Sequence, residues 1–115
     1  MRMKNLVILA ALLAAPLAFA QAPNAGNPDN GKKVFERMIC SACHGHDGQG
    51  GSSGPRIGVR PPALPALIAY VRRPAGNMPP FSAKVVSDQE LADIHAYLSS
   101  RPAPPPLKDI PLLNQ

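Results

Sequence analysis

The sequence predicts an all-α domain of three or four short helices. Apolar residues recur at spacings of three and four in three separate segments, and residues that favour helix starts precede them. No alternating pattern of strands and helices surrounds the two cysteines. The chain has 115 residues, with three Phe, two Tyr and no Trp, so it can form one small domain that has little bulk of its own to bury.

The chain divides into four predicted parts: a secretory signal peptide at 1–20, a flexible segment at 21–26, a domain at 27–101 and a proline-rich extended tail at 102–115. The first part has the basic residues Arg2 and Lys4, an apolar run and a small-residue cleavage pattern. We expect its removal, with retention as an anchor as the alternative, and a mature protein in the periplasm. No later run approaches the ~20 apolar residues that a spanning helix needs, so no transmembrane segment is expected after removal.

The first helix of the domain is predicted from Pro28 to about Cys43. Asn27 is a favourable N-cap, and Pro28 suits the first helical position. The apolar face of this helix consists of Gly31, Val34, Phe35 and Met38 or Ile39.

A second helix is predicted from Pro65 to about Arg72. Pro65 can open it, Pro74 closes it, and its apolar positions follow the spacing of an amphipathic helix. These positions are Leu64, Leu67, Ile68 and Val71.

The last helix is predicted from Asp88 to Ser100, before Pro102. Ser87 and Glu90 have the spacing of a capping box, with Val86 and Leu91 as a hydrophobic staple around it. Its broad apolar face is expected to cross the first helix at close range, where a glycine lets the two backbones approach.

Cys40, Ser41, Ala42, Cys43 and His44 form a CxxCH motif, the attachment signature of c-type haem. One helical turn separates the thiols, so both can add to vinyl groups along one haem edge, and the adjacent imidazole then lies beneath the iron. The alternatives are a thiol redox pair or half of a zinc site. No second CxxC or HxxxH completes a zinc site, and a haem would fill the space that this small core leaves.

Two further residues are candidates for holding the haem. A ligating histidine usually donates its other ring N–H to a fixed acceptor, and the Pro55 carbonyl is the candidate acceptor for His44. Met78 lies on a stiff NMPPF segment, and a thioether there is the expected second axial ligand. His46 lies too close behind His44 to reach the opposite haem face, and His95 belongs to a helix that packs the core.

The charge pattern argues against a nucleic-acid partner, and the glycine-rich stretch lacks the features of a phosphate-binding loop. Loss of 1–20 lowers the net charge from +5 to +3, no basic run exceeds two residues, and no nucleic acid is expected as a partner. The glycine-rich stretch 45–62 lacks the Lys-Ser or Lys-Thr of a phosphate loop and is predicted to be mostly flexible surface loop. Four arginines are candidates for neutralising haem propionates or forming a docking surface, with an ordinary solvated basic surface as the alternative: Arg56, Arg60, Arg72 and Arg73.

On these motifs the chain resembles a small bacterial class I cytochrome c. The resemblance runs from about Gly31 to Ser100 and rests on GKKVFE, CSACHG, GPRI, the stretch from YVRRP to NMPPF, and LADIHAYL. It implies a class I cytochrome c fold wrapped around one covalently bound haem. It also implies Cys40 and Cys43 as thioether anchors, His44 and Met78 as axial ligands, and Pro55 as the orienting acceptor.

With both axial positions filled, the iron has no vacant site for a substrate, so we expect an electron carrier and no enzyme. The leading hypothesis is a periplasmic single-electron carrier between a redox donor and a redox acceptor. The alternative is a cytochrome c subunit of a periplasmic dehydrogenase or terminal oxidase, suggested by the tail and the stretch from Tyr70 to Phe81. A third hypothesis, a ligand-binding or peroxidatic haem protein, requires an absent or labile Met78.

Overall fold

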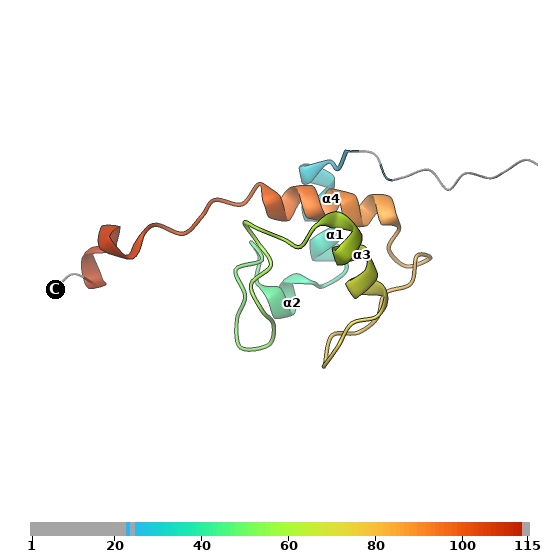
Figure 1. Ribbon diagram of the computed structural model, residues 1–115, viewed down its shortest axis with the longest axis horizontal. Helices are drawn as coiled ribbons and strands as arrows, with labels where there is room; N and C mark the ends of the chain where they lie inside the picture. Colours follow the sequence, from blue (N-terminus) through green and yellow to red (C-terminus); the bar gives the residue numbers. More distant parts are fainter. Residues whose placement is uncertain (1–22, 24, 114–115) are drawn as a thin grey trace, which may run out of the picture.

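The computed structural model describes residue 23 and residues 25–113, so the predicted signal peptide at 1–20 lies outside the described residues. The described part is helical and contains no strand, which confirms the all-α prediction (Figure 1). Its elements are α1 (Pro28–Arg37), α2 (Ser41–His44), α3 (Leu64–Arg72), α4 (Asp88–Ser99) and two short 3-10 turns, η1 (Leu107–Asp109) and η2 (Pro111–Leu113). Both α1 and α3 pack against α4.

Helix α1 begins as predicted but ends early. The Asn27 side chain accepts hydrogen bonds from the backbone N–H groups of Asp29 and Asn30 at 2.9 and 3.1 Å, which makes it the N-cap. The helix stops at Arg37, so the prediction of one continuous helix to about Cys43 is wrong.

A left-handed residue separates α1 from α2. Ile39 has φ of 60°, and the backbone N–H groups of Ile39 and Cys40 bond back to the carbonyls of Glu36 and Phe35 at 3.0 and 3.1 Å. This is the Schellman pattern, in which glycine usually occupies the left-handed position. A β-branched residue there costs on the order of 1–2 kcal/mol, and the apolar pattern across 38–39 gives no sign of the turn.

Helices α3 and α4 agree with their predicted positions to within one residue at each end. The N–H of Glu90 donates to Ser87 Oγ at 3.1 Å, and the N–H of Ser87 donates to Glu90 Oε2 at 2.8 Å, which confirms the capping box. Val86 and Leu91, the two sides of the predicted staple, are each only 2% exposed.

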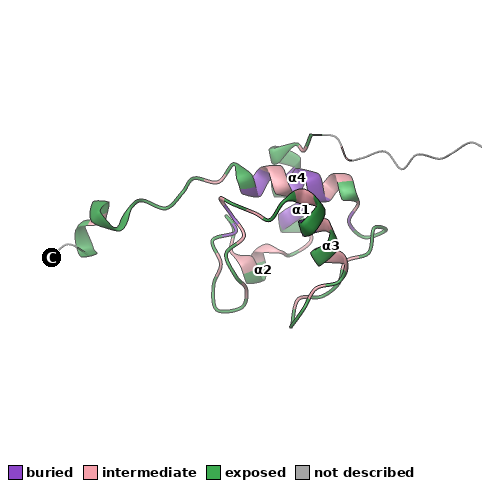
Figure 2. Cartoon of the chain, viewed as in Figure 1, coloured by how far each residue is buried: buried purple, intermediate pink, exposed green. Residues whose placement is uncertain are grey.

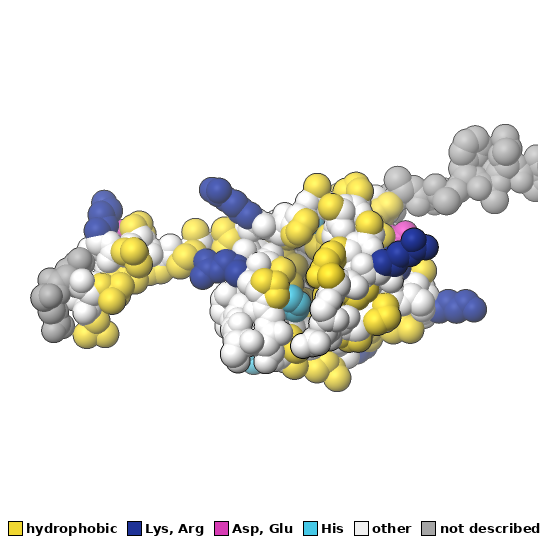
Figure 3. Space-filling view, turned by 60° about the horizontal axis from the view of Figure 1, so that its bottom comes forward, with side chains coloured by type: hydrophobic (Ala, Val, Ile, Leu, Met, Phe, Trp, Pro, Cys, Tyr) yellow, Lys and Arg dark blue, Asp and Glu magenta, His cyan; other side chains and the backbone are white. Residues whose placement is uncertain are grey.

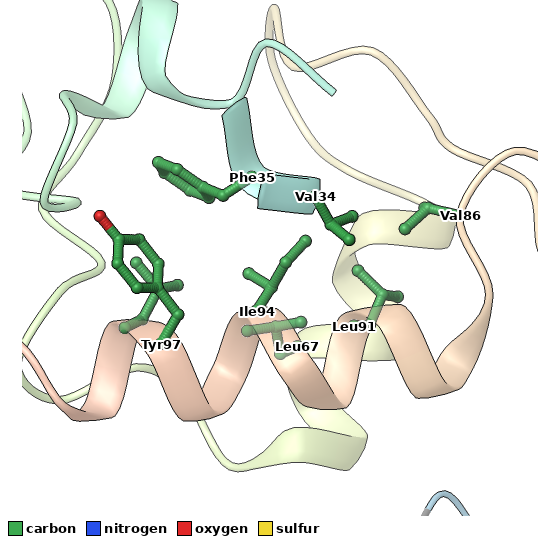
Figure 4. Close-up of a cluster of buried hydrophobic side chains, with 8 residues drawn as sticks. Val34, Phe35, Leu67, Val86, Leu91, Ile94 and Tyr97 are labelled. Carbon is green, nitrogen blue, oxygen red and sulfur yellow. The ribbon is translucent and has the colours of Figure 1, made fainter. Parts of the chain in front are cut away.

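The core lies where α1 crosses α4 (Figures 2 and 4). A Cβ added at Gly31 would lie 1.9 Å from the Asp93 carbonyl oxygen, so the two backbones touch at this glycine as predicted. Beside it, the rings of Phe35 and Tyr97 pack with centroids 5.7 Å apart. The buried cluster consists of Val34, Phe35, Leu67, Val86, Leu91, Ile94, Tyr97 and Leu98.

One buried carboxylate, Asp93 of α4, fixes the start of α1. It accepts hydrogen bonds from the Asn27 N–H at 2.8 Å, from Asn30 Nδ2 at 2.6 Å and from Gln89 Nε2 at 3.2 Å. Burial raises the pKa of Asp93, but these hydrogen bonds outweigh burial and hold the pKa below its ordinary value. Gly26, assigned by sequence to the flexible segment, also packs here, because its added Cβ would lie 2.0 Å from the Ala92 carbonyl oxygen.

The tail leaves the end of α4 and runs away from the helices (Figure 1). Residues 102–106 have no regular secondary structure, and the turns η1 and η2 follow them. Leu107, Leu112 and Leu113 are 72%, 79% and 62% exposed. None of the helices in the described part of the chain has the length and apolar character needed to cross a bilayer.

Gly31→Ala should lower the free energy of unfolding by about 2 kcal/mol or more, because the new methyl group meets backbone atoms that cannot rotate away. Urea unfolding followed by circular dichroism measures it. Gly51→Ala is the control, since nothing lies within 4 Å of its added Cβ, and its change should stay within about 0.5 kcal/mol. Equal losses in both variants would contradict the close crossing.

Asp93→Asn should lower the free energy of unfolding by about 2 kcal/mol at pH 7, because donors that now bond a carboxylate would face an amide. Since folding depresses the pKa of Asp93, its contribution is complete above the ordinary value of 3.8 and is lost as the pH falls through the lower folded value. The gap between wild type and variant should therefore narrow below about pH 4. Urea titrations at pH 7 and below about pH 4 test this, with Asp109→Asn as an exposed control. A difference in unfolding free energy between wild type and Asp93→Asn that grows in acid would contradict it.

Candidate functional site

The last four residues of the CxxCH motif form α2, a single helical turn, and Cys40 lies between this turn and the left-handed Ile39. Cys40 caps this turn, and its carbonyl accepts from the backbone N–H of His44 at 3.0 Å. Both cysteines are free thiols; Cys40 is half-buried and Cys43 is exposed. The turn therefore brings the predicted anchors and the predicted axial histidine together on one short rigid element.

The environment of Cys40 does not match that of a reactive thiolate. Burial raises the pKa of Cys40, a backbone hydrogen bond lowers it by less, and the nearby Cys43 raises it by a smaller amount still. Nucleophilic and redox-active cysteines have a lowered pKa instead. Among the residues described by the structure, no three His, Cys, Asp or Glu side chains gather as a metal site. Thiol redox chemistry and zinc binding therefore find no support here.

His44 forms the hydrogen bond predicted from the sequence. Its Nδ1 lies 2.8 Å from the Pro55 carbonyl oxygen, which can only accept, so Nδ1 carries the proton. That tautomer leaves the lone pair on Nε2, the atom that can bind a metal. Gly54 permits the approach, because a Cβ there would lie 2.8 Å from the Cys43 carbonyl oxygen and 3.2 Å from His44 Nδ1.

The loop that follows the motif is fastened to α4, and the prediction of a mostly flexible stretch is wrong for this part. The Tyr97 hydroxyl donates to the His46 carbonyl at 2.7 Å. The Arg101 guanidinium lies over the Tyr97 ring, 4.4 Å from its centroid, and pairs with Asp47 at 3.1 Å. A few residues on, the N–H of Val59 donates to the Leu98 carbonyl at 2.9 Å. The segment that presents Pro55 to His44 is thus anchored on both sides.

Met78 lies on the other candidate segment, between α3 and α4, and is half-buried. The backbone N–H of Phe81 donates to the Val71 carbonyl of α3 at 3.0 Å and holds the end of the NMPPF stretch against that helix. Arg72, which the sequence assigned to propionates or to docking, instead donates to the Phe81 carbonyl and pairs with Asp88. Sequence reasoning missed this role because the partners lie nine and sixteen positions away.

A set of apolar side chains lies on the core but stays partly exposed, and it includes the thiol of Cys40. On the face shown in Figure 3, a histidine side chain lies among hydrophobic side chains. Two thiols, an imidazole with a free Nε2, a thioether and an apolar surround are the donors and surface that haem c requires, so the residues fit this group. The partly buried set comprises Met38, Cys40, Ile57, Ile68, Val71 and Phe81.

A family model described as "Cytochrome C oxidase, cbb3-type, subunit III" matches residues 26–98. The chain belongs to this family. It is a small cytochrome c domain of the class I type, and its function is haem-based electron transfer, as the resemblance implied. The matched region includes α1, α2, α3, all of α4 except its last residue, the CxxCH motif and Met78. No curated protein and no solved structure matches the chain. The individual roles of Cys40, Cys43, His44, Pro55 and Met78 in this cytochrome c domain remain predictions.

The other two histidines of this cytochrome c domain have different hydrogen-bond partners from His44. His46 is exposed, and its carbonyl is engaged by Tyr97. His95 is half-buried on α4, and its carbonyl accepts from Ser99 Oγ at 2.7 Å. Arg56 and Arg60 are exposed and line one shallow hollow beside Ala103.

Gly54→Ala should weaken the hydrogen bond between His44 and Pro55, because the added methyl group would press on both the Cys43 carbonyl and the imidazole. We expect the His44 ring N–H to exchange with solvent about tenfold faster, as measured by NMR of the purified protein. Gly51→Ala, with no neighbour within 4 Å, is the control and should leave the rate unchanged. An unchanged rate in Gly54→Ala would show that the ring is held by something else.

Proposed function

We propose that this protein is a periplasmic single-electron carrier with one haem c, attached covalently through Cys40 and Cys43 and ligated by His44 and Met78. The observation that carries the proposal is the 2.8 Å contact between His44 Nδ1 and the Pro55 carbonyl, directly beside two free cysteines. A surface histidine with no ligand to bind has no need of a fixed tautomer. The family match to residues 26–98 supports the same chemistry.

Each residue of the site has a separate task in this proposal. When bound, haem c supplies one-electron exchange between ferric and ferrous iron. Cys40 and Cys43 hold the group to α2 through two thioether bonds, so it cannot dissociate. His44 offers Nε2 to the metal, while Pro55 fixes the proton on Nδ1 and makes the imidazole a stronger donor.

Met78 determines which chemistry is allowed. Its thioether is a soft, neutral donor, which favours the ferrous state and raises the reduction potential. His44 and Met78 would hold the haem iron between them, and a substrate or peroxide would then have no position to bind. The protein should therefore pass electrons without making or breaking bonds, and we propose no enzymatic activity.

The apolar side chains around the candidate site would affect the reduction potential and the place where an electron partner docks. Ile57, Ile68 and Phe81 pack against the core and stay partly exposed, so they would exclude water from a haem bound beside them and thereby raise its reduction potential. Ile39 and Tyr70 are 68% and 50% exposed, so apolar surface reaches the outside of the domain. An electron partner would approach such an exposed apolar edge.

The partners in this proposal are redox proteins, a donor and an acceptor, met in the periplasm after signal removal. The family description names an oxidase subunit, which favours a terminal oxidase as the acceptor or as the complex to which this chain belongs. The extended tail with its exposed leucines is a second reason to keep the subunit reading. Purification from native membranes separates the readings: a carrier elutes alone, whereas a subunit co-elutes with the oxidase in fixed ratio.

Met78→Leu should abolish the ferric sulfur-to-iron charge-transfer band, because leucine keeps the volume but removes the sulfur. The reduced variant should also bind carbon monoxide, whereas the reduced wild type should not. Met38→Leu is the matched control, a half-buried methionine that packs on the core, and should keep the band. If Met78→Leu keeps the band, or if carbon monoxide binds the reduced wild type, Met78 is not a stable axial ligand.

A further inference from the structure

The segment that carries Met78 is a loop closed at its base. It leaves the end of α3 at Arg73 and returns beside α3 at Phe81 before the chain enters α4 (Figure 1). The N–H of Phe81 donates to the Val71 carbonyl at 3.0 Å. Arg72 Nη1 donates to the Phe81 carbonyl at 2.9 Å. Both polar groups of the Phe81 backbone are thereby bonded to consecutive residues at the end of α3.

A third element fixes the guanidinium itself. Arg72 Nη2 lies 2.5 Å from Asp88 Oδ1, in the first turn of α4. The Arg72 side chain is 20% exposed and the Asp88 side chain 54%, so the arginine side of the ion pair is shielded from water and the carboxylate side is open to it. One side chain therefore links the end of α3, the end of the Met78 loop and the start of α4.

The short path from Phe81 to Met78 is stiff. Only Pro79 and Pro80 lie between them, and each proline ring fixes its own φ and restricts the residue before it. A displacement of the Phe81 backbone should therefore also move Met78, because the two prolines between them have few backbone rotations that could compensate. On the other side of Met78, the Tyr70 hydroxyl donates to the Ala75 carbonyl at the long distance of 3.5 Å, and Gly76 has φ of 67° and no heavy atom within 4 Å of an added Cβ, so that side is held less tightly than the Phe81 side.

We propose that Arg72 is a positioning residue for Met78: its guanidinium holds the Phe81 carbonyl and Asp88 together and so keeps the thioether at the iron. The inference rests on the proposed function, because it takes Met78 to be the axial ligand. Arginine suits the task, since its planar fork donates to two acceptors in fixed directions. A lysine keeps the charge but cannot hold both acceptors in that geometry.

Competition with imidazole in the ferric protein tests the proposal. Exogenous imidazole displaces an axial methionine only when the thioether leaves the iron, so its apparent affinity reports how well Met78 is held. The variants are Arg72→Gln and Arg72→Lys, with Asp88→Asn as a third that removes only the carboxylate. Arg73→Gln is the matched control: it makes the same charge change one residue later, at an exposed side chain without a hydrogen-bond or ion-pair partner among the described residues.

We expect Arg72→Gln to raise the imidazole affinity at least tenfold and Arg72→Lys to raise it by a smaller factor, while Arg73→Gln leaves it within twofold. Amide hydrogen exchange at Phe81 should accelerate in the same order. Circular dichroism of the helices shows whether Arg72→Gln folds. If it does not fold, the Arg72→Lys variant still tests the inference.

Equal affinities in the Arg72 and Arg73 variants would overturn the inference and leave the proposed function intact. A wild-type protein that shows no sulfur-to-iron charge-transfer band has a different meaning. It would overturn Met78 as the ligand and the positioning role with it, so the two failures are distinguishable.

Discussion

The contact between the backbones of α1 and α4 at Gly31 is the constraint on which the rest of the structure depends. It places the buried side chains of both helices in one cluster, and Asp93 then binds the first turn of α1. Because α2 follows α1 after a single tight turn, this crossing also sets where the CxxCH motif lies relative to α4. Because the two helices approach so closely, little space is left between them to fill. A small domain without tryptophan can therefore pack this interface with medium-sized side chains.

Two separate segments of the chain supply the candidate site, and each is tied back to the helices by a few polar contacts. Tyr97 and Arg101 hold the loop behind His44, whereas Arg72 and Asp88 hold the loop that carries Met78. In our proposal one axial ligand, His44, ends the short helix α2 and the other, Met78, lies on a loop, while their supports come from α3, α4 and Arg101, two residues beyond α4. This arrangement explains how a protein with a small core can keep two ligands in place.

Much of the fold was predictable because its signals are local. The capping box at Ser87 and the prolines around α3 determine where those helices begin, and periodicity identifies the buried faces. The break after Arg37 was not predictable, because Ile39 is a residue that disfavours the left-handed conformation it adopts. CxxCH, Met78 and the Pro55 acceptor were readable as candidates from sequence, whereas the role of Arg72 depends on tertiary contacts that no local pattern encodes.

The central claim is that Cys40 and Cys43 bind one haem through two thioether bonds. The pyridine haemochrome spectrum of the purified protein tests this most directly, because its α band shifts when the vinyl groups become saturated. The account predicts one haem per chain, an α band at the position for two saturated vinyl groups, and pigment that stays with the polypeptide in acidified acetone. A folded, colourless protein with two titratable thiols would contradict it.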